Sequence, residues 1–133
     1  MAEVSGPGEL SHPEEIAKFR KELADSGVEL IERDHESLGY CPGLKAEQPG
    51  QMHVSKGASY SAWCHEMQHM RDDRDAGWEG IMRSLMDKDG RFAREQRAYG
   101  VEIALAESAG REDIAERLWA NLKEEGRAIY GDG

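Results

Sequence analysis

The 133-residue sequence has few of the features that mark secreted, disulfide-linked or membrane-spanning proteins. Its two cysteines, Cys41 and Cys64, are too few for a disulfide framework and lack CxxC spacing. No window approaches the roughly 18 apolar residues that a membrane span needs. The amino terminus has neither the basic nor the apolar segment of a secretory signal. We therefore expect a protein of a reducing compartment, the cytoplasm, with no membrane partner.

Basic side chains are also scarce, since 17 lysines and arginines stand against 27 acidic residues and give a formal net charge of -10. The acidic excess is spread along the chain and leaves no basic stripe, so we expect no nucleic-acid partner. A content of 38% hydrophobic and 33% charged residues is typical of a soluble globular chain, and the length fits one domain. We expect a disordered lead-in over residues 1–10 and a single domain over 11–131.

Hydrophobic periodicity predicts several helices and two short strands. A helix start at Ser11 and a stop at Gly27 bound the first helix. Alternating patterns predict strands at 28–34 and 51–55, with a loop between them. The remaining elements are helices at 58–74, 92–108 and 111–129 and a short helix or turn at 81–86. This pattern indicates an α+β fold, mostly helical, with a small two- to three-stranded sheet packed on the 58–74 helix.

The helix expected over 58–74 contains the motif HExxH, formed by His65, Glu66 and His69. Residues four apart lie on one helix face about a turn apart, so both imidazoles can reach one metal ion. Glu66 lies beside them and can accept a proton from a water that the metal activates. Trp63 and Met67 lie on the other side of this helix and are expected in the core. The motif predicts a metal-dependent hydrolase.

A third protein ligand is needed, because catalytic zinc sites use three protein ligands and leave a position for water. Glu95 is one candidate, on a later helix where Tyr99 and Glu102 share its face at i+4 and i+7. Tyr99 could then donate to a developing oxyanion, and Glu102 would lie close to the metal. The alternative for Glu95 is a solvated acid paired with Arg91 or Arg94.

Other residues near the motif offer alternative ligands. Asp75 stands where the extended motif HExxHxxGxxH/D places its last ligand, but Asp72 replaces the glycine at the turn. Asp72 or Asp73 can instead accept a hydrogen bond from a ligand imidazole and orient it. A His2Cys site is a further alternative, although a helix points Cys64 about 100° away from His65. We expect Cys64 to be a buried apolar residue.

The motif and its surroundings resemble the zincin metallopeptidases, and among them the gluzincins, in which two helix histidines and a later glutamate hold Zn²⁺. The runs Leu38-Gly-Tyr-Cys-Pro-Gly and Ala58-Ser-Tyr-Ser-Ala-Trp-Cys-His-Glu-Met-Gln-His resemble small metallopeptidase domains of phage and prophage structural or head-morphogenesis proteins, related to zincin domains of polyvalent proteins and toxins. The resemblance covers about residues 28–131. It implies a zincin-like fold, Zn²⁺ held by His65, His69 and Glu95, and a bacterial or phage-encoded protein of the cytoplasm or virion.

In zincins a strand above the motif helix runs antiparallel to the bound substrate. The resemblance assigns this role to the strand that contains Gln51, Met52, His53 and Val54, where a peptide could add by backbone pairing.

We therefore expect a zinc-dependent metallopeptidase that hydrolyses a peptide or protein substrate with Glu66 as the general base. The alternative is a catalytically silent, zincin-shaped binding or assembly module of a phage or prophage structural protein. A purely structural helical domain, whose two histidines are solvated and hold no metal, is a third hypothesis. No oligomeric state is assigned.

Overall fold

The computed structural model describes residues 7–34 and 39–131. It is an α+β fold, mostly helical, with one three-stranded sheet, as the sequence predicts. The elements in chain order are α2 (Gly8–Ser11), α3 (Pro13–Asp25), β1 (Glu29–Arg33), β2 (Gly39–Cys41), β3 (Gln51–Ser55), α4 (Tyr60–Asp75), α5 (Ile81–Met86), α6 (Lys88–Ser108) and α7 (Glu112–Tyr130). Within the described residues, no helix combines the length and apolarity that a membrane span requires.

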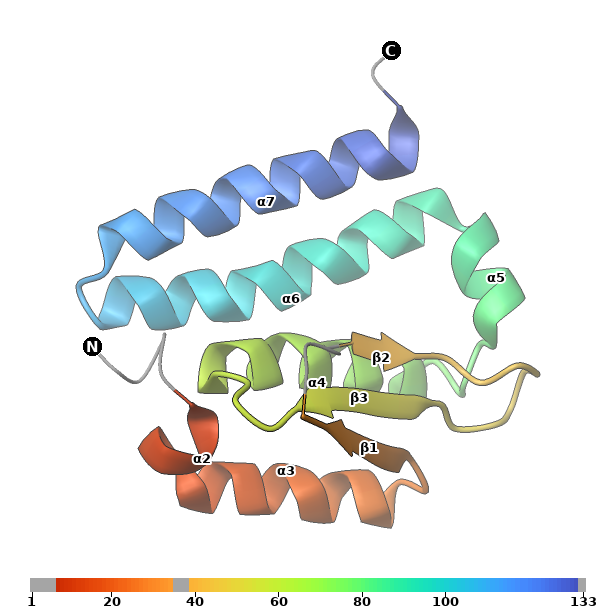
Figure 1. Cartoon of the computed structure of the whole chain (residues 1–133). Helices are drawn as coiled ribbons and strands as arrows, with labels where there is room; N and C mark the ends of the chain where they lie inside the picture. Colours follow the sequence, from red (N-terminus) through yellow and green to blue (C-terminus); the bar gives the residue numbers. More distant parts are fainter. Residues whose placement is uncertain (1–6, 35–38, 132–133) are drawn as a thin grey trace.

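Helix α4 occupies the middle of the molecule (Figure 1). The sheet and α3 lie on one side of it, and the antiparallel α6–α7 hairpin lies on the other. The larger core cluster joins α3, the sheet and α4, and its most deeply buried side chains are Leu23, Met52, Val54, Trp63, Met67 and Met70. A smaller cluster of Ile103, Ala106 and Ala115 joins α6 to α7. Trp63 and Met67 therefore face the core, as the helix periodicity predicts.

Strand β3 is the centre of the sheet, whose order is β1-β3-β2. β1 pairs with it in parallel, and β2 pairs with it antiparallel through Tyr40 opposite Met52. The prediction that Gln51, Met52, His53 and Val54 form a free edge strand is therefore wrong, because both sides of β3 are already paired. β2 was expected to be loop because it is only three residues long and Gly and Pro flank it.

Several helix boundaries differ from the predicted ones for local reasons. α4 begins at Tyr60 because Ser59 caps it and accepts a hydrogen bond from the amide of Ala62 at 3.1 Å. α6 begins at Lys88, four residues before the expected start, because the Asp87 side chain accepts from the amide of Gly90.

Part of the predicted disordered lead-in is ordered. Residues 1–6 lie outside the described residues, but α2 starts at Gly8, and the Gly8 amide donates to the carbonyl of Ala58 at 2.8 Å. Pro7 also forms a bridge with Ser59. A side chain at position 8 would lie 2.8 Å from the amide nitrogen of Tyr60, so glycine permits this close approach. Helical structure therefore begins at Gly8, three residues before the predicted helix start at Ser11.

Candidate metal centre

Packing of α6 against α4 brings three predicted ligands together. The Nε2 atoms of His65 and His69 are 3.2 Å apart. The Glu95 carboxylate reaches both from α6: Oε1 contacts His69 Nε2 and lies 3.9 Å from His65 Nε2. These donor atoms all lie within 4.8 Å of one another, and among the described residues this is the one such group found. The structure therefore confirms a group that could hold a metal ion.

The metal group is electrostatically coupled in the absence of a metal. Burial disfavours protonation of His65, but hydrogen bonds to Glu102 and Glu95 outweigh it and raise the pKa of the imidazole to about 10. Burial also disfavours the charged form of Glu95, yet hydrogen bonds from His65 and His69 lower the pKa of this carboxyl to about 2. A proton on His65 and a negative charge on Glu95 therefore stabilise each other at neutral pH.

Glu102 orients His65 from the far side of the ring. Its Oε2 lies 2.6 Å from His65 Nδ1, and its Oε1 accepts a hydrogen bond from the Ser61 hydroxyl at 2.9 Å. A histidine that donates Nδ1–H to a carboxylate presents the lone pair of Nε2 to a metal. Glu102 was predicted close to the metal, and it is the acid that holds a ligand imidazole.

The three aspartates after the motif lie elsewhere. Asp72 accepts from Arg97 Nε at 3.1 Å, and buried Asp73 accepts from the Tyr40 hydroxyl at 2.5 Å. Asp75 is exposed and pairs with Arg74. The extended motif would need a turn after His69, but α4 continues helical through Asp75. Asp75 therefore does not join the metal group, and neither Asp72 nor Asp73 shows a hydrogen bond to the ligand imidazoles.

β2 lies against α4 and holds the motif glutamate. The amide of Tyr40 donates to Glu66 Oε1 at 2.9 Å, while the Tyr40 hydroxyl donates to Asp73 and accepts from the amide of Gly50 at 3.1 Å. Glu66 and Asp73 are seven residues apart on α4, so one helix face holds β2 at two points. Sequence reasoning gave Tyr40 little weight. No local signal pointed to this role, because Tyr40 and Asp73 are 33 residues apart in the chain.

Tyr99 packs edge-on against His65, with ring centroids 4.5 Å apart and planes at 89°. It lines a hollow between α4, α6 and α7, which we call the His65 hollow. The residues that line this hollow are Ala62, His65, Glu66, Tyr99, Glu102, Leu118 and Asn121. Burial, followed by the nearby carboxylates, raises the pKa of the Tyr99 phenol to about 12, so the hydroxyl keeps its proton at neutral pH. The predicted proton donor and the predicted base thus share one hollow.

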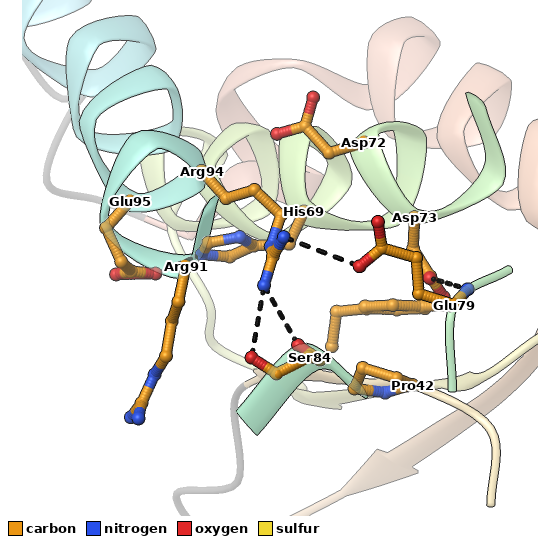
Figure 2. A pocket seen from close by; sticks show the side chains of 10 residues that line it. Pro42, His69, Asp72, Asp73, Glu79, Ser84, Arg91, Arg94 and Glu95 are labelled. Carbon is orange, nitrogen blue, oxygen red and sulfur yellow. Dashed lines mark hydrogen bonds and ion pairs between the residues drawn. The ribbon is translucent and has the colours of Figure 1, made fainter. Parts of the chain in front are cut away.

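A second hollow flanks the metal group on the other side, and we call it the His69 hollow (Figure 2). β2, α4, α5 and α6 contribute to its walls. The residues that line it are Tyr40, Pro42, His69, Asp72, Asp73, Glu79, Ser84, Arg91, Arg94 and Glu95. Arg94 reaches across it to the Ser84 hydroxyl at 3.0 Å and to Glu79 at 3.6 Å. The alternative for Glu95, a solvated acid paired with Arg91 or Arg94, is not what the structure shows, because Glu95 contacts the histidines.

Cys64, the alternative thiol ligand, and His53, on the predicted substrate strand, do not join the metal group. Cys64 is 8% exposed and belongs to the larger core cluster, and burial raises the pKa of its thiol to about 11. It is therefore the buried apolar residue that was expected. His53 lies in the middle of β3, opposite Ile31 and Gly39.

Comparison of the chain with protein-family models, with curated proteins and with solved structures found no match. The metal group is therefore interpreted from its own geometry.

Proposed function

We propose that this protein is a zinc-dependent metallopeptidase. The observation that carries the proposal is the convergence of His65 Nε2, His69 Nε2 and the Glu95 carboxylate from two helices, with Glu66 next to them on α4. The resemblance of the same residues to the gluzincins supports it.

The donor set suits zinc. Two imidazoles and one carboxylate are a donor set of catalytic zinc sites, which leave a coordination position open for water or substrate. A structural zinc site would instead use four protein ligands, commonly thiolates, and the nearest thiol, Cys64, faces the core. Zinc bound there would act as a Lewis acid that polarises a peptide carbonyl and lowers the pKa of a water molecule.

The chain's own residues have distinct parts in this proposal. Glu66 accepts the proton of the attacking water and passes it to the leaving amine. The Tyr40 amide holds one oxygen of that carboxylate, which limits its rotation. Tyr99, which keeps its hydroxyl proton at neutral pH, donates to the oxygen on which negative charge develops. β2, rather than β3, offers the sheet edge along which an extended peptide can lie.

The test combines metal content with cleavage of a peptide library. Wild-type protein should contain about one zinc per chain by plasma mass spectrometry, and His69→Ala should lose it. Glu66→Gln should retain zinc and lower the cleavage rate about 10²- to 10⁴-fold, because the general base is gone. Glu116→Gln, an exposed change on α7, is the matched control and should leave the rate unchanged.

Two outcomes would contradict the proposal. Cleavage that persists in Glu66→Gln would exclude this residue as the base. Zinc-loaded wild-type protein that cleaves no peptide, and captures a partner equally well as Glu66→Gln, would favour the binding module instead.

A further inference from the structure

The residues of the metal group line two separate hollows. His65 and Glu66 line the His65 hollow, while His69 and Glu95 line the His69 hollow. The proposed chemistry uses the His65 hollow, which contains Glu66 and Tyr99. Under the proposed function, a peptide bound with its scissile carbonyl at the metal group would have the His69 hollow available for the residue on one side of that bond.

The acids that line the His69 hollow already have partners. Asp72 accepts from Arg97, Asp73 accepts from Tyr40 and from the Glu79 amide at 3.0 Å, and Glu95 contacts His69. Glu79 lies 3.6 Å from Arg94. Since each carboxylate is paired, the hollow has no free acid to attract a basic side chain.

The two arginines of the hollow differ. Arg94 is only 15% exposed and is engaged by Ser84 and Glu79. Arg91 is half-buried and lines the same hollow, but within the part of the chain that the structure describes its guanidinium has no hydrogen-bond or ion-pair partner. Figure 2 shows the two side chains diverging, with the head of Arg91 away from the groups that hold Arg94. Arg91 thus has five N–H donors available for a ligand.

Arg91 lines the same hollow as two residues of the metal group, His69 and Glu95. It lies one helical turn before Glu95 on α6, and side chains four residues apart on a helix are neighbours. A guanidinium binds a carboxylate through two parallel, charge-assisted N–H···O bonds. With a divalent metal on the metal group, the two arginines and the metal balance the charge of the four carboxylates that line the hollow.

We propose that Arg91 binds a carboxylate of the substrate, so that the protein selects peptides with an acidic side chain or a free carboxyl terminus beside the scissile bond. That the bound carboxylate belongs to a substrate rests on the proposed function, but binding of a carboxylate at Arg91 does not depend on turnover.

The binding test uses zinc-loaded Glu66→Gln protein and three small probes. Ac-Ala-Glu-NH2 offers only a side-chain carboxylate, Ac-Ala-Gln-OH only a terminal one, and Ac-Ala-Gln-NH2 neither. Side-chain NMR of ¹⁵N-labelled arginine should show a saturable shift of Arg91 Nε with one or both of the charged probes and none with the third. Which charged probe acts identifies the source of the carboxylate.

A series of variants distinguishes binding of the carboxylate by Arg91 from its direct binding to zinc. Introducing Arg91→Ala into the Glu66→Gln protein should lower the affinity for the charged probe that binds about 10- to 100-fold, as expected for a charge-assisted pair. Arg91→Lys should be intermediate, because lysine keeps the charge and loses the fork. Arg83→Ala, an exposed change on α5, is the control and should leave the affinity unchanged.

Cleavage then distinguishes the two proposals. Wild-type protein should cleave acidic members of a peptide library preferentially, and Arg91→Ala should lose that preference while it still cleaves neutral peptides. Probe binding at Arg91 without any cleavage would overturn the proposed peptidase and support the carboxylate site. Two results would overturn the carboxylate site. One is equal affinity for the charged and uncharged probes, and the other is a charged probe that binds the Arg91→Ala protein as tightly as the protein that retains Arg91.

Discussion

At the residue scale, two carboxylates lie near the two ring nitrogens of the His65 imidazole. Glu102 lies 2.6 Å from Nδ1, and Glu95 approaches Nε2 at 3.9 Å. Glu95 can exchange its histidine contact for a metal bond, whereas Glu102 is held by Ser61 and fixes the ring. The same pair of acids therefore tunes both the geometry of the ligand and its affinity for a proton.

Substitution of Glu102 by Gln should weaken metal binding while the fold is retained. The amide is a poorer acceptor for Nδ1–H, so the ring loses its orientation and its basicity. We expect the zinc affinity of the deprotonated site, corrected for the proton that His65 holds in the metal-free protein, to fall about 10- to 100-fold. Competition with a chromophoric chelator measures this. Glu107→Gln, an exposed change on the same helix, is the control. An affinity equal to that of wild type would show that Glu102 does not position His65.

Metal affinity should also fall as the pH falls. Since the metal-free protein holds a proton on His65 up to a pKa of about 10, zinc must displace that proton at neutral pH. The proton on His65 should therefore by itself lower the zinc affinity about tenfold for each unit by which the pH falls. Chelator competition between about pH 6 and pH 8, corrected for the chelator's own protonation, measures the slope. A pH-independent affinity would contradict the raised pKa of His65.

At the scale of elements, the site depends on how β2 is seated on α4. Tyr40 connects the two, with its amide on Glu66 and its hydroxyl on Asp73. Gly50, at the start of β3, supplies the third contact through its own amide. A Cβ atom at position 50 would lie 2.1 Å from the Cys41 carbonyl oxygen and 2.5 Å from the Tyr40 hydroxyl. Only glycine allows β2 to approach this closely.

Gly50→Ala should therefore destabilise the protein by about 2 to 3 kcal/mol, because backbone atoms must move to admit the methyl group. Gly57→Ala is the matched control, since no atom lies within 4 Å of the added methyl group there. Its effect should stay within about 0.5 kcal/mol. Urea denaturation monitored by circular dichroism measures both free energies of unfolding. Equal stabilities of the two variants would show that β2 does not pack as described.

The sequence predicted these elements to different degrees. The long helices α3, α4, α6 and α7 were predictable because each has an apolar stripe, whereas α2 falls within the lead-in that was expected to be disordered. β2 was not, because three residues are too few to show an alternating pattern. The central position of β3 was not predictable either. Strand order depends on which segments meet in space, and the sequence of Gln51–Ser55 does not contain that information.

At the scale of the whole molecule, α4 is held from both sides. α6 packs against the face of α4 that contains His65 and His69. α3 is attached to α4 through Glu22. Arg71 donates two hydrogen bonds to this carboxylate at 2.8 and 2.7 Å, and Arg74 donates one at 3.0 Å. Hydrogen bonds from Arg71 outweigh burial and lower the pKa of Glu22. The helix that carries the metal group is thereby attached to the amino-terminal layer.

Glu22→Gln should destabilise the protein at neutral pH by about 1 to 2 kcal/mol, since the pairs are partly exposed. A lowered folded-state pKa means that the ionised carboxylate stabilises the fold above the ordinary value of 4.5 and that this stabilisation disappears as pH falls below it. The two proteins should therefore differ at pH 7 and converge in acid. Urea denaturation at pH 7 and in acid measures the difference in the free energy of unfolding, with Glu116→Gln as control. A difference that persists in acid would contradict the ion-pair explanation.

The sequence by itself determined the chemistry of α4. A spacing of four residues in a helix of 3.6 residues per turn is enough to place His65 and His69 on one face and to put Glu66 beside them. Tertiary structure decided the rest: Glu95 rather than Asp75 completes the group, Glu102 orients His65 and Tyr40 holds Glu66. It also leaves Arg91, in the His69 hollow, without a partner among residues 7–34 and 39–131. Local periodicity predicts what shares a helix face. Contacts between α4, β2 and α6 depend on packing of residues distant in sequence, which no local pattern encodes.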